Sequence, residues 1–192
     1  MDPSKDDDRR AYHRLRFRAQ VELTLLDPAL AADPEGLRAR LKRELRMLHW
    51  LKLDNQYAFV RDSAMRTQPA LSPLIRLIDA KLDFLTGELF DHNPPATDLQ
   101  HVEMSATGLA FEWPESLPPD ALCLVRIDPA GSDAPLNLPA VVQRGAAAAE
   151  PPASCIVVEF FALTEDETDA LASWIVARQA RALSRQRSAE DD

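Results

Sequence analysis

A heptad seam at residues 71–89 most constrains what this chain can fold into. Its apolar members recur in steps of four and three residues, and they are Leu71, Ile75, Ile78, Leu82, Leu85 and Leu89. This spacing predicts one long helix, opened by Ser72-Pro73, whose apolar stripe must be covered by another helix. The stripe is covered by a neighbouring helix of the same chain, by a helix of another subunit, or by both.

A second helix is predicted upstream of the seam, from Asp33-Pro34-Glu35 to about Leu53. An Asp cap followed by proline is a typical helix start. The helix carries a basic stripe from Arg38 to Arg46. Such a stripe is usually a solvated face, and its alternative role is to hold an anionic partner. Residues 54–69 are polar and mixed, and they predict a connection between the two helices.

Most of the remaining chain has the patterns of β-strands. Apolar residues alternate with polar ones from Arg16 to Leu25, which predicts a strand with one buried face. Further strands are predicted at 99–104, 108–113, 121–127, 136–144 and 154–163. Pro139 lies inside one of these runs and predicts an edge or a bulge there. Thr164 and Glu167 match the capping-box pattern and predict a closing helix, docked through Leu171 and its neighbours.

The expected fold is therefore mainly β, of the α+β class. It is a six-stranded antiparallel barrel with a two-helix heptad insertion after the first strand and a C-terminal helix. Residues 1–26 and 99–192 would form the barrel domain. Residues 27–98 would form an inserted helical oligomerisation element.

The net charge of −9 argues against general nucleic-acid binding, because that affinity requires many phosphates to be neutralised. Within this acidic chain, however, the lead to the first strand is densely basic, with arginines at positions 9, 10, 14, 16 and 18. Such a patch suits a compact anion. No apolar run approaches the ~20 residues of a membrane span, and the cytoplasm is the expected location.

The sequence carries no recognisable catalytic or metal-binding pattern. It has no Walker loop and no GxGxxG, and its four histidines show no metal-ligand spacing. No nucleophile-elbow pattern surrounds Ser105. We therefore expect a non-enzymatic protein with no metal and no cofactor.

Two short motifs lie at the ends of predicted strands. Residues 9–14 read RRxxxR just before the first strand, and residues 103–108 read ExSxxG at the first hairpin after the insertion. This arrangement resembles the PilZ domain family, which has RxxxR and [D/N]xSxxG at these places. The resemblance covers residues 9–26 and 99–186. The insertion resembles the atypical tetrameric PilZ subgroup, in which heptad helices build the oligomer.

The resemblance implies a receptor for cyclic di-GMP that relays the messenger to an unidentified protein partner and self-associates as a tetramer. Arg10 and Arg14 would be the principal clasps and Arg9 an auxiliary one. Guanidinium groups suit this role because they match both phosphate oxygens and the edge of guanine.

The hairpin motif would supply the other ligand contacts. Glu103 stands where the family has Asp or Asn and would accept hydrogen bonds from guanine. Ser105 would supply a hydroxyl, and Gly108 would permit a turn conformation and close approach of the ligand. The extra methylene of Glu103 either retunes or silences the site, since one lost charged hydrogen bond costs roughly 1.5–3 kcal/mol.

Two alternatives stay open. The arginines have a second interpretation as a solvated patch that neutralises the acidic lead of Asp6, Asp7 and Asp8. The corresponding alternative function is an oligomeric protein-interaction scaffold. In that case the PilZ-like domain is degenerate, binds no nucleotide and supports the helices.

Overall fold

The computed structural model describes residues 14–90, 99–130, 135–144 and 154–190 of the chain. The first part contains β1 (Leu15–Leu25), η1 (Pro28–Ala32), α2 (Pro34–Arg40), α3 (Arg46–Thr67), η2 (Pro69–Leu71) and α4 (Ser72–Phe90). The second part contains β2 (Gln100–Ser105), β3 (Gly108–Trp113), β4 (Leu122–Pro129), β5 (Leu136–Arg144), β6 (Ser154–Phe160) and α5 (Glu165–Glu190).

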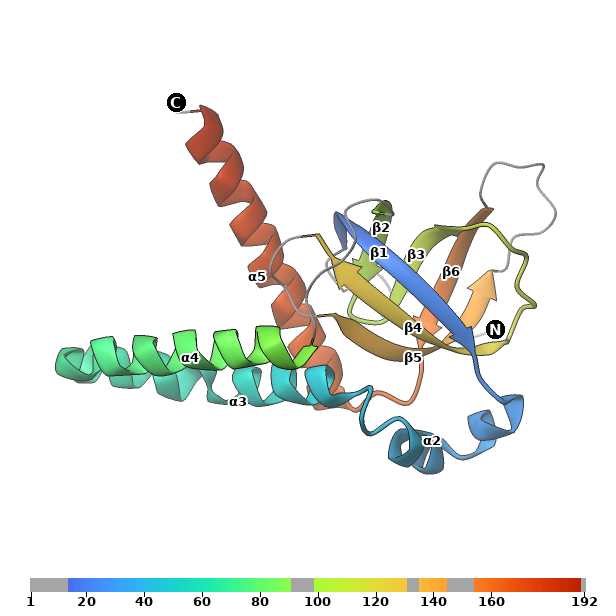
Figure 1. Ribbon diagram of the computed structural model, residues 1–192, viewed down its shortest axis with the longest axis horizontal. Coiled ribbons are helices and arrows are strands. Elements are labelled where there is room, and N and C mark those ends of the chain that lie inside the picture. The colour runs from blue at the N-terminus through green and yellow to red at the C-terminus, as the bar shows by residue number, and fades with distance from the viewer. Residues whose placement is uncertain (1–13, 91–98, 131–134, 145–153, 191–192) are drawn as a thin grey trace, which may run out of the picture.

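The strands form a closed antiparallel barrel in the order β1-β2-β3-β6-β5-β4 (Figure 1), which confirms the predicted six-stranded fold. Closure depends on β1, which pairs with two strands. Residues Leu15–Ala19 pair with β2, and residues Ala19–Leu25 pair with β4. The inward-facing side chains fill the barrel, and Phe111, Val125 and Leu138 are at most 2% exposed.

Pro139 lies in β5, which is hydrogen-bonded on both sides, so the barrel offers it no edge. Its carbonyl accepts a hydrogen bond from the Phe161 amide at 2.8 Å, just beyond the end of β6. The backbone nitrogen of Pro139, which has no hydrogen to donate, faces that same side, where the β5–β6 ladder ends. A register shift does occur in β5, but between Val142 and Arg144.

The closing helix α5 docks through Leu171 and Ile175, as predicted, and both side chains are fully buried. Its Trp174 ring meets the Phe17 ring of β1 edge to face, with the ring centroids 6.1 Å apart. The Arg178 guanidinium lies over Phe17 at 4.8 Å and donates to the Ala130 carbonyl. Phe17 lies on the core-facing side of β1, so α5 packs against the barrel's hydrophobic core.

The prediction of one helix from 34 to about 53 is wrong. The chain turns at residues 41–45 between α2 and α3. Helix-like backbone hydrogen bonds still join Leu41 to Leu37 and Leu45 to Leu41, each at 2.9 Å. These three leucines are buried. The first part of the insertion therefore belongs to the same hydrophobic core as the barrel.

The predicted connection at 54–69 is also wrong, because α3 continues to Thr67. This stretch leaves the barrel, so it needs no apolar face toward the core, and the sequence shows no helical period there. An ion pair between Arg61 and Asp54 at 2.9 Å lies on its surface. The position of this stretch outside the barrel thus explains why its sequence lacks the apolar period of a helix.

The helices α3 and α4 extend away from the barrel together (Figure 1). Their pairing within one chain leaves much of the heptad seam exposed. Ile78, Leu82 and Leu85 are 48%, 37% and 52% exposed. On α3, Tyr57, Phe59 and Val60 are more than half exposed as well. A hairpin within one chain therefore leaves the apolar stripe uncovered. The side chain of Leu89 lies outside the described residues.

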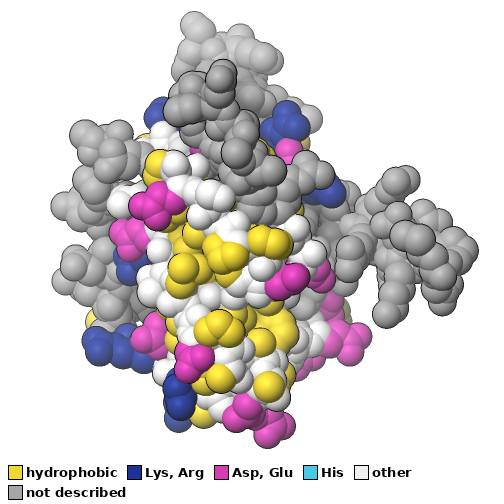
Figure 2. Space-filling view, turned by 90° about the vertical axis from the view of Figure 1, so that its right-hand side faces the viewer, with side chains coloured by type: hydrophobic (Ala, Val, Ile, Leu, Met, Phe, Trp, Pro, Cys, Tyr) yellow, Lys and Arg dark blue, Asp and Glu magenta, His cyan; other side chains and the backbone are white. Residues whose placement is uncertain are grey.

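The end of the barrel away from these helices has a different surface (Figure 2). Hydrophobic and acidic groups occupy the middle of this face, and basic groups lie at its margin. No helix in the described ranges is long and apolar enough to cross a bilayer.

Two ion pairs join the first turn of α5 to the insertion. Glu167 receives two bonds from the Arg38 guanidinium, at 2.6 and 2.7 Å, and Lys52 pairs with Asp166 at 2.8 Å. Glu167 also forms the predicted capping box, since its carboxylate accepts from the Thr164 amide and its own amide donates to the Thr164 hydroxyl. Arg38 further donates to the carbonyl of Ala162, a residue with a positive φ of 57°.

The Arg38–Glu167 pair shifts the pKa of both groups. Burial by itself would raise the pKa of Glu167, but the bonds from Arg38 and Thr164 outweigh it, and the pKa lies below its ordinary value. The bonds to Glu167 raise the pKa of Arg38. The charged pair therefore persists in the folded protein at neutral pH.

We expect Glu167→Gln to lower the free energy of unfolding at pH 7 by about 1.5–3 kcal/mol, because glutamine keeps the cap but loses the charged bonds. The stabilisation by Glu167 is complete above its ordinary pKa of 4.5 and is lost as the pH falls through the lowered folded value. The difference between the two proteins should therefore shrink toward pH 3. Urea denaturation at both pH values measures it, with exposed Glu165→Gln as the control. An equal loss in the control would contradict the assignment.

Candidate functional site

Arg14, the last residue of the first motif, meets Glu103 of the second motif on the outer face of the β1–β2 pair. Arg14 immediately precedes β1, and Arg16 lies directly opposite Glu103 of β2 in the strand register. The Arg14 Nη1 atom donates to Glu103 Oε1 at 3.1 Å, and Arg16 Nε donates to Oε2 at 2.8 Å. Two guanidinium groups thus hold one carboxylate.

The charges of this cluster face solvent. The side chains of Arg14 and Arg16 are 67% and 84% exposed, and that of Glu103 is 26% exposed. The hydrogen bonds from Arg16 and then Arg14 hold the pKa of Glu103 below its usual value. Exposed ion pairs of this kind contribute only about 0–1 kcal/mol each. The fold therefore loses little stability if a ligand anion takes over one of these bonds.

The ExSxxG motif forms the two-residue turn between β2 and β3. Ser105 pairs with Gly108 in register across this turn. The Ser105 hydroxyl accepts from the Thr107 amide at 3.3 Å and lies 3.2 Å from the Thr107 hydroxyl. Ser105 is half-buried and points to the same side of β2 as Glu103, two residues earlier. Its hydroxyl therefore borders the arginine–carboxylate cluster.

Gly108 does not have the special turn conformation that was predicted, and its approach to a ligand stays a prediction. Its backbone does not adopt the left-handed conformation that would require glycine. A Cβ atom at this position would lie 2.5 Å from the Val158 carbonyl oxygen of β6. Close approach of the neighbouring strand thus accounts for the glycine without a ligand.

The residues beside Glu103 are small and form a low surface. Glu103 faces Ala110 of β3, and Ala110 faces Val157 of β6. Both Ala110 and Val157 are half-buried on the outer side of the barrel. A flat ligand has room over Ala110 and Val157, beside the carboxylate of Glu103.

Sequence reasoning did not select Arg16 as a ligand residue, although it is the more exposed of the two arginines at Glu103. Arg16 can be identified only from the strand register, and that register is known only once β2 of the first hairpin is paired with β1. Arg18 lies next to the cluster on the same side of β1 and donates to the Leu99 carbonyl at 3.2 Å. Arg9 and Arg10 lie outside the described residues.

The described ranges contain no group of three His, Cys, Asp or Glu side chains placed to hold a metal ion. The donors and acceptors of the cluster are two guanidiniums, one carboxylate and one hydroxyl. This set binds an anion with a hydrogen-bonding ring more readily than it performs nucleophilic chemistry.

The closed barrel, the helices inserted after β1 and the closing helix together form a PilZ-like fold. A solved structure supports this assignment: a pathogenic protein from Xanthomonas campestris, described as a new tetrameric PilZ domain self-assembled via an unusual helical bundle. It aligns with a TM-score of 0.55 and 22% identity over 96% of each chain. At this identity the likeness establishes the fold alone.

The other two comparisons found no counterpart. No protein-family profile matches the sequence, and no curated protein matches it. The PilZ-like assignment therefore rests on the fold and on the residues described above.

We expect Gly108→Ala to destabilise the barrel by about 1–3 kcal/mol, because the added methyl group meets the β6 backbone, which cannot move alone. Thermal unfolding of the variant measures this loss. Ser105→Ala in the same turn is the control and should cost less than about 1.5 kcal/mol. Wild-type stability of Gly108→Ala would show that the glycine is not needed for strand packing.

Proposed function

We propose that the protein is a cytoplasmic receptor for cyclic di-GMP that passes the messenger signal to a protein partner, and that it is not an enzyme. One observation carries the proposal. Arg14 and Glu103 belong to motifs far apart in the sequence, and the barrel brings their side chains to 3.1 Å. Arg14 of the first motif and Glu103 of the second thus lie on one surface, which supports the proposal.

Each group of this surface has a role in the proposed complex. Arg14, with Arg9 and Arg10 of the same lead, binds the phosphates and the guanine edge. Glu103 accepts from the guanine N–H groups, and Ser105 donates its hydroxyl. Ala110 and Val157 form the floor beside Glu103. Arg16 is the additional cation of this site.

Glu103 retains binding in this proposal in spite of its length. Its two oxygens already accept from Arg14 and Arg16. A carboxylate has about four acceptor positions, so further bonds to guanine are available to it. The arginines also hold the carboxylate in its charged form, which is the better acceptor.

Self-association is the second part of the proposal. The exposed apolar side chains of α3 and α4 need a cover in water, and another copy of the same hairpin has a matching stripe. The Xanthomonas structure is tetrameric through a helical bundle. We infer the same arrangement for this chain, with the seam from Leu71 to Leu89 at its centre.

The exposed hairpin also favours a second candidate function, an oligomeric scaffold that binds no nucleotide. The two functions differ in their response to the messenger. A scaffold keeps the same assembly and the same partners with and without cyclic di-GMP.

Isothermal titration with cyclic di-GMP tests the receptor function. We expect micromolar binding by the wild-type protein and loss of detectable binding in Arg10→Ala/Arg14→Ala, because removal of charged bonds costs roughly 1.5–3 kcal/mol each. Arg66→Ala, an exposed arginine of α3, is the control and should bind normally. Undisturbed binding in the double variant would exclude the proposed site. No heat with the wild type up to about 1 mM would favour the scaffold.

Analytical ultracentrifugation tests the hairpin interface. We expect Ile78→Glu/Leu85→Glu to dissociate the oligomer, because four or more charges would be buried in the bundle. Leu183→Glu on α5 is the control, since Leu183 and Leu85 are 51% and 52% exposed in the single chain. An oligomer that survives the double change but not the control would place the interface on α5.

A further inference from the structure

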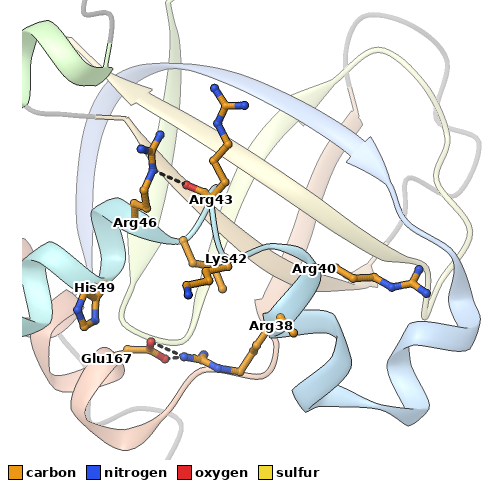
Figure 3. A pocket seen from close by; sticks show the side chains of 9 residues that line it. Arg38, Arg40, Lys42, Arg43, Arg46, His49 and Glu167 are labelled. Atoms are coloured by element: carbon orange, nitrogen blue, oxygen red, sulfur yellow. Dashed lines mark hydrogen bonds and ion pairs between the residues drawn. The ribbon is translucent and has the colours of Figure 1, made fainter.

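A second basic region of the molecule forms a pocket where α2 turns into α3, remote in sequence from both motifs (Figure 3). It encloses about 730 Å³. Its charged walls comprise Arg38, Lys42, Arg43, Arg46, His49 and Glu167. The side chains of Lys42 and His49 extend toward the Arg38–Glu167 pair, and those of Arg43 and Arg46 extend in the opposite direction. Arg40 borders the pocket but points away from it.

The charge of this pocket is opposite to that of the whole protein, which carries −9. Glu167 is its one carboxylate among the lining residues, and Arg38 already neutralises it. In the described ranges no carboxylate lies within ion-pair distance of Lys42 or Arg43. Among the described residues, Lys42 and Arg43 therefore add positive charge to the pocket without a carboxylate at ion-pair distance.

The turn at residues 41–45 is what creates the pocket. In a continuous helix the basic residues from 38 to 46 would spread around much of the helix surface. The turn instead leaves α2 and α3 on two sides of a hollow, with buried Leu45 between them. Cations held on both sides of one hollow repel each other unless an anion lies between them.

The geometry points to a binding site for a small organic phosphate in this pocket. Its volume lies within the range of about 300–1,000 Å³ typical of small-molecule sites. Guanidinium groups can bind two phosphate oxygens at once. Leu45 and the methylene groups of the basic side chains provide an apolar surface for the organic part of the ligand. A nucleic-acid duplex does not fit, because the chain as a whole is acidic.

The site is independent of the proposed messenger site, which lies on β1 and β2. Occupancy would bridge α2 and α3 beside the first turn of α5, where Arg38 and Lys52 already make ion pairs. A bound phosphate therefore adds a contact at the base of the projecting α3–α4 helices.

Titration with inorganic pyrophosphate tests the inference, with binding heat and the proton NMR signals of the His49 ring as readouts. We expect one site per chain, a shift of the His49 signals, and affinity at least about tenfold weaker in Lys42→Ala/Arg43→Ala. Arg66→Ala/Arg76→Ala removes the same charge from exposed positions on α3 and α4 and should bind as the wild type does.

Three outcomes would overturn the site. They are no binding at about 1 mM, an equal loss in the control pair, or unchanged His49 signals at saturation. The Arg10→Ala/Arg14→Ala variant separates the two sites. It should lose cyclic di-GMP but keep pyrophosphate binding, and loss of pyrophosphate binding in that variant would assign the phosphate to the barrel instead.

Discussion

The structure depends on the double pairing of β1. One strand closes the barrel by binding β2 with its first half and β4 with its second half. The first half carries the arginines opposite Glu103, and the second half leads into the insertion after Leu25. The candidate ligand site and the projecting helices are therefore both attached to the strand that closes the barrel. A change in the register of β1 would alter both together.

Two arginine–carboxylate assemblies in this molecule differ in burial, and this difference determines whether the ion pair stabilises the fold or can exchange with a ligand. At Arg38–Glu167 the carboxylate side chain is 5% exposed and capped, so the pair is a fixed part of the fold. At Arg14, Arg16 and Glu103 the groups face water, and exchange of the carboxylate for a ligand costs little. The Arg38–Glu167 pair holds the insertion against α5. The arginines at Glu103 stay in contact with solvent, where a ligand can reach them.

The sequence predicted the barrel well because its strands bury one face, and period-two patterns report that burial directly. It also predicted α4 and the Thr164–Glu167 cap. It failed on α3, since the helix beyond Leu53 packs on no core and leaves no periodic trace. It missed Arg16, whose position opposite Glu103 follows only from the strand register. The turn at 41–45 was also missed, because buried leucines keep helical spacing through it.

The double pairing of β1 also sets the order of events during synthesis. β1 leaves the ribosome before the helices, but its partners β2 and β4 follow the entire insertion. Its ladder is thus made only of long-range contacts, which close late and slowly. Meanwhile the apolar stripe of α4 is already outside the ribosome, where the proposed self-association would bring it against the same stripe of neighbouring nascent chains. Chains of one polysome can therefore associate through their helices before any barrel has closed.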